Sequence, residues 1–178
     1  DSGYLATDTT NIVGIKQRAF QGSSVASIET PVSVTFIGAE AFEGCQNLAS
    51  ATINTDPDGC DLIGDSAFAN STLNTVTFSN TSSAAAPLKL GVNAFLNTKM
   101  KAVEIPASAT NVEAGCFAQN HSLASVKFVA GGNSDVKIEQ YAFYNCEALS
   151  ELAFEDEGKQ YEIAQGAFSI EKMPEGRD

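Results

Sequence analysis

The sequence predicts a repeat solenoid of seven coils, β-rich with short helical turns. Two observations predict it. A small residue followed by Phe recurs at intervals of 22 to 27 residues, and an aliphatic residue stands five positions before each Phe. A period of this length is the signature of stacked repeat units. The phenylalanines are Phe20, Phe42, Phe68, Phe95, Phe117, Phe143 and Phe168, and the aliphatic residues are Ile15, Ile37, Ile63, Leu90, Val112, Ile138 and Ile163.

A strand is expected after each connection that follows the Phe. An apolar triplet with internal spacing of three and then two recurs there, and side chains at i and i+2 of a strand share one face. The connection, for example 43–47, is too short for an ordinary helix of about 11 residues but long enough for a turn or a short helical segment. The triplets are Val25/Ile28/Thr30, Leu48/Ala51/Ile53, Leu73/Val76/Phe78, Met100/Val103/Ile105, Leu123/Val126/Phe128 and Leu149/Leu152/Phe154.

The coils form a larger repeat. Residues 19–68 align with 94–143 at a constant offset of 75 without a gap, which indicates duplication of a block of three coils. A single coil has too little apolar surface to stay folded alone, so stability is expected to depend on contacts between neighbouring coils.

The pattern I-x3-A-F-x2-C-x2-L-x2-V-x-F, with the Pro-containing form at 30–42, closely resembles the BspA-type leucine-rich repeat over about residues 12–168. The resemblance implies a right-handed leucine-rich repeat solenoid with a parallel sheet on one face. Members of that family are typically secreted or surface-anchored proteins of host-associated bacteria and some protists, and several are implicated in adhesion. The chain departs from the pattern at Thr30 and at Cys116, which replaces the usual Ala.

The organisation and charge of the chain restrict its partners. We expect one domain over 1–178, with a partial N-terminal cap at 1–14, seven coils at 15–168 and a tail at 169–178 that is no complete eighth coil. The chain is therefore expected to be a fragment or a short mature protein. The formal charge of −12 opposes binding to nucleic acid or an anionic membrane. No apolar run approaches the roughly 18 residues of a membrane helix, and the first residues lack the features of a signal peptide.

The four cysteines are expected to be free thiols. Cys45 and Cys146 occupy equivalent positions four coils apart, about 19 Å at a strand spacing near 4.8 Å, which excludes a disulfide between them. Cys116 faces the predicted core, and Cys60 lies in a loop. Buried cysteines of this kind usually behave as small apolar residues.

We expect no catalytic centre, cofactor or resident metal. His121 is the only histidine, so no centre with several imidazoles can form. An EF-hand loop that began at Asp56 would need Glu at its twelfth position, which is Ala67, so 56–61 is read as a turn with a weak metal site as the alternative. Three sequons, at Asn70, Asn80 and Asn120, would matter only in a eukaryotic secretory host.

Two surfaces are candidates for a protein partner. The first is the row of exposed strand residues, for which the solvated-face interpretation stands as the alternative. The second is the edge that carries the insertions at about 54–62, 79–89, 129–137 and 155–162, where binding residues often lie on a rigid scaffold. The acidic cluster Glu155, Asp156, Glu157 and Glu162 would favour a basic partner. The row comprises Glu29, Thr52, Thr77, Glu104 and Lys127 as possible partner-binding residues, followed by Ala153.

The function predicted from this architecture and resemblance is a non-enzymatic extracellular or cell-surface module for protein–protein interaction, in adhesion to host or other cells. The partner is expected to be a host or bacterial surface protein. A structural spacer within a larger surface protein is the alternative. A polysaccharide-acting β-solenoid enzyme is a third hypothesis, although the aligned strand row is rich in Thr rather than in acidic and basic groups.

Overall fold

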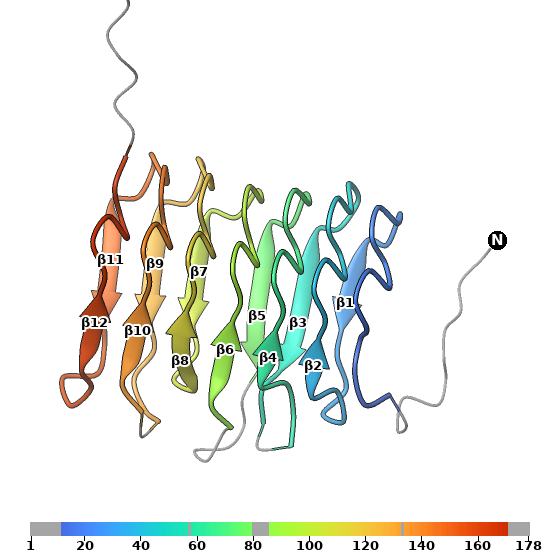
Figure 1. Cartoon of the computed structure of the whole chain (residues 1–178), viewed down its shortest axis with the longest axis horizontal. Coiled ribbons are helices and arrows are strands. Elements are labelled where there is room, and N and C mark those ends of the chain that lie inside the picture. Colours follow the sequence, from blue (N-terminus) through green and yellow to red (C-terminus); the bar gives the residue numbers. More distant parts are fainter. Residues whose placement is uncertain (1–11, 57, 80–85, 133, 171–178) are drawn as a thin grey trace, which may run out of the picture.

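The computed structural model describes residues 12–56, 58–79, 86–132 and 134–170. They form a β-solenoid in which each regular turn contributes one strand to each of two faces (Figure 1). The predicted cap at 1–14 and tail at 169–178 fall largely outside the described residues. No helix that could cross a membrane occurs in the described part of the chain.

One face is a parallel six-stranded sheet built from the residues that open each I-x3-A-F segment. Six strands enclose five complete turns, and an isolated bridge between Ile15 and Ile37 continues the stack toward the N-terminus. The seven predicted coils are thus seven copies of the I-x3-A-F segment, and the strands of this sheet bound about five complete turns of the solenoid. The strands are β2 (Phe36–Ile37), β4 (Leu62–Ile63), β6 (Leu88–Leu90), β8 (Ala109–Val112), β10 (Val136–Ile138) and β12 (Tyr161–Ile163).

The other face carries the strands predicted from the apolar triplets. They form two parallel three-stranded sheets, because hydrogen bonding is interrupted between β5 and β7. The interruption falls where the first three-coil block gives way to the second. The prediction of a sheet on one face was therefore wrong, since both faces carry sheets. The strands are β1 (Ser27–Glu29), β3 (Ser50–Asn54) and β5 (Thr75–Ser79), then β7 (Ala102–Ile105), β9 (Ser125–Phe128) and β11 (Glu151–Phe154).

The predicted short helical turns are absent from the described residues, which form hydrogen-bonded turns at these positions. The reason is local backbone geometry. Six of the seven turns that contain a Phe hold two residues in the left-handed region, such as Glu40 (φ 56°) and Gly44 (φ 68°), and the last holds one, Gly166. A right-handed helix cannot continue through such residues. We call each of these turns a corner.

The core is a vertical ladder of phenylalanine rings. Successive rings from Phe20 to Phe168 have centroids 4.8 to 5.2 Å apart and planes within 5° of parallel. This spacing follows the separation of neighbouring strands, about 4.8 Å. Phe42, Phe68, Phe95, Phe117 and Phe143 are buried, whereas Phe20 at one end is 42% exposed. The predicted alignment of the phenylalanines in one continuous stack is confirmed.

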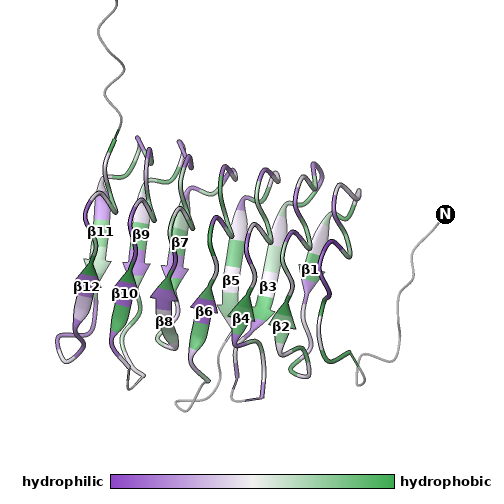
Figure 2. Ribbon diagram, viewed as in Figure 1, coloured by the Kyte–Doolittle hydropathy of each residue, from purple (hydrophilic) through white to green (hydrophobic). Residues whose placement is uncertain are grey.

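Strand residues alternate between this core and the solvent. In β6, for example, Leu88 and Leu90 are buried and Lys89 is exposed. Figure 2 shows hydrophobic and hydrophilic residues following one another along the strands. The two departures from the repeat pattern are accommodated. Thr30 is buried, and its hydroxyl oxygen accepts a 2.9 Å hydrogen bond from the Asn54 amide. Cys116 is fully buried in the position of the usual Ala.

Candidate functional site

The predicted row of outward side chains is in register on the face with the interrupted sheets. Glu29, Thr52 and Thr77 align through β1, β3 and β5. Glu104, Lys127 and Ala153 align through β7, β9 and β11. The row is thus split into two groups by the gap between β5 and β7.

Lys127 is already engaged within the row. Its Nζ lies 3.3 Å from an oxygen of Glu104 and 3.0 Å from an oxygen of Glu155. Hydrogen bonds to Glu155 and Glu104 raise the pKa of Lys127, and the same contact lowers the pKa of Glu155. Ion pairs this exposed contribute little stability. The remaining members are small or acidic, so the row offers no apolar anchor for a partner.

The inserted loops lie at the edge of the solenoid opposite the corners, which is the lower edge in Figure 1. Hydrogen bonds link some of these loops to loops of neighbouring coils. Asp156 accepts a hydrogen bond from the Gly131 amide at 3.0 Å, and this bond lowers its pKa. Lys159 Nζ donates to the Ala107 carbonyl at 2.5 Å. The predicted turn near Asp56 is also present, because the Gly59 amide donates to the Asp56 carbonyl at 2.6 Å. Part of the 79–89 insertion lies outside the described residues.

The corners expose two further columns of side chains, where a column means equivalent positions in successive coils. All of these residues have φ between 51° and 74°, the region that favours Gly and Asn. The first column, three residues after the aliphatic, is Arg18, Glu40, Ser66, Asn93, Gly115, Tyr141 and Gly166. The second, two residues after Phe, is Gly22, Gly44, Asn70, Asn97, Gln119 and Asn145.

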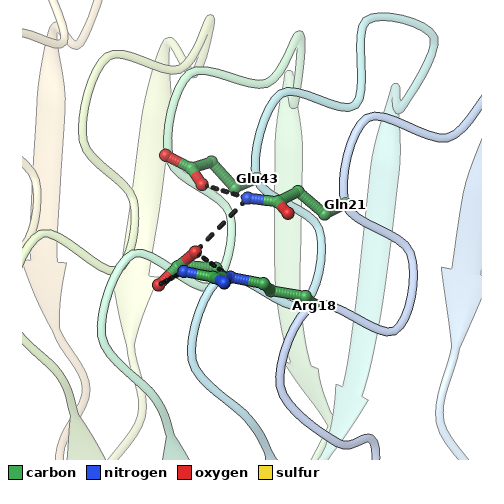
Figure 3. Close-up of polar contacts among 4 residues, drawn as sticks. Arg18, Gln21 and Glu43 are labelled. Atoms are coloured by element: carbon green, nitrogen blue, oxygen red, sulfur yellow. Dashed lines mark hydrogen bonds and ion pairs between the residues drawn. The ribbon is translucent and has the colours of Figure 1, made fainter.

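At the N-terminal end the corners carry long polar side chains that bind one another. Arg18 donates from Nε to Glu40 at 2.5 Å and from Nη2 at 3.1 Å. Gln21 donates to Glu43 at 2.7 Å and to Glu40 at 3.3 Å (Figure 3). The hydrogen bond with Arg18 lowers the pKa of Glu40, and the pKa of Arg18 rises correspondingly. The polar cluster thus holds one cation and two carboxylates, and each carboxylate accepts at least one hydrogen bond within the cluster.

Small residues replace these long side chains farther along the stack and leave a groove across the corners. Ala114, Gly115 and Ala118 occupy one coil and form its floor. Their column neighbours form the walls, two coil spacings or about 10 Å apart, because adjacent ring centroids are 5.0 and 5.1 Å apart. We name this site, of about 570 Å³, the corner groove. Its walls and end are Val92, Asn93 and Leu96 on one side, Tyr141 and Tyr144 on the other, and Gln119.

The tyrosine wall holds a strained residue. The rings of Tyr141 and Tyr144 meet edge to face, with centroids 5.5 Å apart at 81°. Tyr141 is 53% exposed and has a φ of 60°, which is unusual for a bulky side chain. The ring fits here because the next coil has Gly at the equivalent position. A Cβ added at Gly166 would lie only 3.1 Å from the ring of Tyr141. Every coil has a left-handed residue at this position, so the conformation belongs to the repeat, and Tyr141 is the aromatic residue in that column.

The cysteine prediction is confirmed, since all four are free and buried. Burial raises the pKa of Cys60 and of Cys146 to about 11 each, and it raises the pKa of Cys116 as well. Cys45 and Cys146 donate from Sγ to the carbonyls of Phe20 and Phe117, at 3.0 and 3.2 Å. The thiols of Cys60, Cys116 and Cys146 are therefore protonated at neutral pH, and all four cysteines pack in the core.

Asn120 occupies the same column as Cys45 and is fully buried. Its amide donates to the carbonyls of Phe95 and Phe117 at 2.8 and 2.7 Å, and its carbonyl accepts from Thr98. This sequon is inaccessible in the folded chain, whereas Asn70 is exposed and Asn80 lies outside the described residues. His121 is exposed and lies 3.4 Å from Glu147. No group of three potential metal ligands occurs within the described ranges.

A family model described as the BspA-type leucine-rich repeat region, of six copies, matches residues 7–87 and 88–175. The chain belongs to this family. No curated protein matches it.

Two solved leucine-rich repeat proteins share the fold. The chain is 27% identical to the leucine-rich repeat protein TpLRR of T. pallidum, with a TM-score of 0.69, covering 89% of this chain and 72% of that one. It is 25% identical to a leucine-rich repeat protein of Bacteroides ovatus, with a TM-score of 0.50, covering 85% and 43%. A leucine-rich cell surface protein of Faecalibacterium prausnitzii matches with 20% identity and a TM-score of 0.33, covering 83% and 52%.

Proposed function

We propose that this BspA-type chain is a non-enzymatic, extracellular or cell-surface module that binds a protein partner in adhesion to host or other cells. Membership of the family supports a binding role, because leucine-rich repeat modules typically bind proteins. The stacked core supports it physically, because the ladder of phenylalanines holds every corner at a fixed position.

The observation that carries the proposal is the corner groove. Exposed apolar surface on a rigid scaffold marks interaction sites in soluble proteins. Here two tyrosines and two aliphatic side chains, Val92 and Leu96, flank a floor without long side chains. Tyrosine is enriched among the residues that dominate binding energy at interfaces. The corners at the N-terminal end do not share this character, because they carry the charged side chains of Arg18, Glu40 and Glu43.

The strand row is a second surface for the same function. Glu29, Thr52 and Thr77 form an open, in-register group, and in Glu104 and Lys127 the charges already satisfy each other. We propose it as an accessory contact, because its side chains can form hydrogen bonds but supply no apolar anchor.

An array of purified host extracellular matrix proteins and bacterial surface proteins tests the proposal. Saturable binding is expected for the wild-type chain. It should be lost in Ala114→Gln, which places in the groove floor the residue found in the same column at Gln17, Gln140 and Gln165. Thr77→Arg is the matched change on the strand row, and a smaller loss is expected there. Silence of the wild-type chain across the array would favour the spacer alternative instead.

A further inference from the structure

The outer surface of the six-stranded sheet carries two further columns of residues. Its six strands lie side by side on one face of the solenoid (Figure 1). The side chains immediately before and after the core aliphatic residue share this outer side, since the amide of Asn111 donates to the carboxylate of Glu113 at 3.1 Å. The first outer column, before the aliphatic residue, is Gly14, Phe36, Leu62, Lys89, Asn111, Lys137 and Glu162. The second outer column, after it, is Lys16, Gly38, Gly64, Gly91, Glu113, Glu139 and Ala164.

The N-terminal half of this surface is apolar. Leu62 is 39% exposed, and Phe36, its neighbour in the first outer column, is half-buried. Gly38 and Gly64 hold the same levels of the second outer column, and both are partly exposed. Phe36 and Leu62 therefore form an apolar ridge, and the two glycines form a shallow trough beside it. Exposed apolar surface of this kind marks a contact with another molecule.

The C-terminal half of the same surface is charged. Lys137 belongs to the first outer column, and Glu139 holds the same level of the second. Lys137 Nζ lies 3.8 Å from an oxygen of Glu162, and both side chains are largely exposed. Glu139 makes no ion pair with any residue in the described ranges. Each column thus offers a charge of opposite sign at one level of the stack.

The two columns complement each other when a second copy of the chain faces the first. A two-fold axis parallel to the solenoid, midway between two facing sheets, sets the first outer column of each copy opposite the second outer column of the other, level by level. The ridge of Phe36 and Leu62 then lies in the trough of Gly38 and Gly64 of the second copy. The symmetry repeats this contact, so each copy supplies one ridge and one trough.

The charges match in the same arrangement. Lys137 faces Glu139 of the second copy, and this contact also occurs twice. Glu113 faces Asn111, and Glu162 faces Ala164, so no carboxylate of these columns lies opposite another. Opposite charges placed in register favour one partner and one orientation.

The parallel orientation is selected over the antiparallel one. An antiparallel two-fold centred on β6 sets the apolar ridge of one copy against the charged half of the other, with Phe36 level with Lys137. The parallel match extends over several coils because the stack has little twist. Successive phenylalanine rings of the ladder lie within 5° of parallel.

We propose that two copies of this chain associate in parallel through the outer surface of the six-stranded sheet, with each apolar ridge in the trough of the other copy. The inference goes beyond the proposed function, and it leaves the strand row accessible on the opposite face of each solenoid. Seven levels of about 4.8 Å and a width of about 10 Å give roughly 340 Å² of sheet per copy, below the about 800 Å² of a standard interface. Both copies also carry a formal charge of −12. We therefore expect a weak dimer, with a dissociation constant of about 1 to 100 μM at an ionic strength of 0.15 M, where repulsion is screened beyond about 8 Å.

Sedimentation equilibrium of the whole chain from about 1 μM to about 1 mM tests the association, because this range brackets the dissociation constant expected for a small interface. The average mass should rise from that of a monomer toward that of a dimer. Leu62→Glu should weaken the dimer at least about tenfold by placing a charge in the trough of the second copy. Thr77→Glu, which adds the same charge on the strand row, should leave the dimer unchanged. The far-ultraviolet circular dichroism of both variants should match that of the wild-type chain.

A charge exchange tests the register. Lys137→Glu and Glu139→Lys should each weaken the dimer about tenfold or more, because each sets like charges opposite one another. The double variant Lys137→Glu/Glu139→Lys should recover most of the affinity, since opposite charges face each other again. Lys101→Glu, which changes the net charge as Lys137→Glu does, is the control outside the interface, and the dimer should persist in it.

Chemical cross-linking tests the orientation. In the parallel dimer the two copies of Glu162 lie at the same level, so Glu162→Cys should be joined by a bis-maleimide with a spacer of about 10 Å, the distance between packed sheets. In the antiparallel dimer these positions lie about 29 Å apart, six strand spacings of about 4.8 Å. A chain that stays monomeric at about 1 mM, equal losses in Leu62→Glu and Thr77→Glu, or a charge exchange without recovery would overturn the inference. Dimers that Glu162→Cys fails to cross-link would exclude the parallel two-fold and overturn it as well.

Discussion

Removing one ring from the phenylalanine ladder should cost stability in proportion to its burial and its number of stacked neighbours. Phe117 is fully buried and stacks on Phe95 at 5.0 Å and on Phe143 at 5.1 Å. Phe20 is 42% exposed, and among the residues that the structure describes it stacks only on Phe42. A buried Phe→Ala substitution costs about 3 to 5 kcal/mol, so Phe117→Ala should fall at the upper end of that range.

Phe20→Ala should cost less. About half of the ring is already in water, and one stacking contact is lost instead of two, so we expect about 1 to 2 kcal/mol. Urea unfolding followed by far-ultraviolet circular dichroism gives both values, provided that the slope of the transition is unchanged. Equal costs for the two variants would refute the picture of a stack in which stability comes from neighbouring coils.

Four further predictions follow from the corners, the thiols and the buried polar column. Tyr141→Gly should change the free energy of unfolding by no more than about 1 kcal/mol, because relief of left-handed strain offsets the added flexibility of Gly; a larger loss in urea unfolding would show that the ring is structural. Asn120→Ala should cost about 2 to 4 kcal/mol by leaving the buried Thr98 amide without its acceptor, whereas the exposed Asn70→Ala should cost about 1 kcal/mol in the same assay, mainly because Ala fits a left-handed backbone less well than Asn. A thiol reagent without reductant should label four cysteines in denaturant and almost none in the native chain at pH 7; fewer than four in denaturant would contradict the free thiols. The pKa of Cys60 and of Cys146 rises from 9.0 to about 11 on folding. The stability that these thiols contribute is therefore present below pH 9 and is lost as pH rises toward 11, by up to about 3 kcal/mol for each thiol. Urea unfolding across this pH range should show a smaller loss of stability in the double variant Cys60→Ala/Cys146→Ala than in the wild-type chain.

The ladder was predictable because the aliphatic residue and Phe keep a fixed separation of five within every coil, while the variable loops fall elsewhere. A constant separation places equivalent residues above one another in any stack of parallel strands. The aligned strand row was predictable for the same reason, since Thr52 and Thr77 each lie between the last two members of a triplet. Free thiols followed from the distance between coils.

Other features lay beyond the sequence pattern. The six-stranded sheet contains strands as short as Phe36–Ile37, which are too short to show alternation of apolar and polar residues. The helical turns were predicted from loop length alone, and the left-handed residues that prevent them include Arg18 and Glu40 as well as Gly and Asn. The corner groove depends on a difference between coils. The side chains of its floor are smaller than those at equivalent positions of the adjacent coils, about 25 residues away in sequence. Comparing the corner columns, where Ala114, Gly115 and Ala118 stand out, could have revealed it.

The most direct test of the functional account is a hydrogen-exchange footprint of the partner identified on the array. Amides of the corner groove segments 92–96, 114–119 and 141–144 should exchange more slowly in the complex than in the free chain. Amides of β1, β3 and β5 should change little. Protection confined to the strand row or to the insertions, with the corner groove unaffected, would contradict the account.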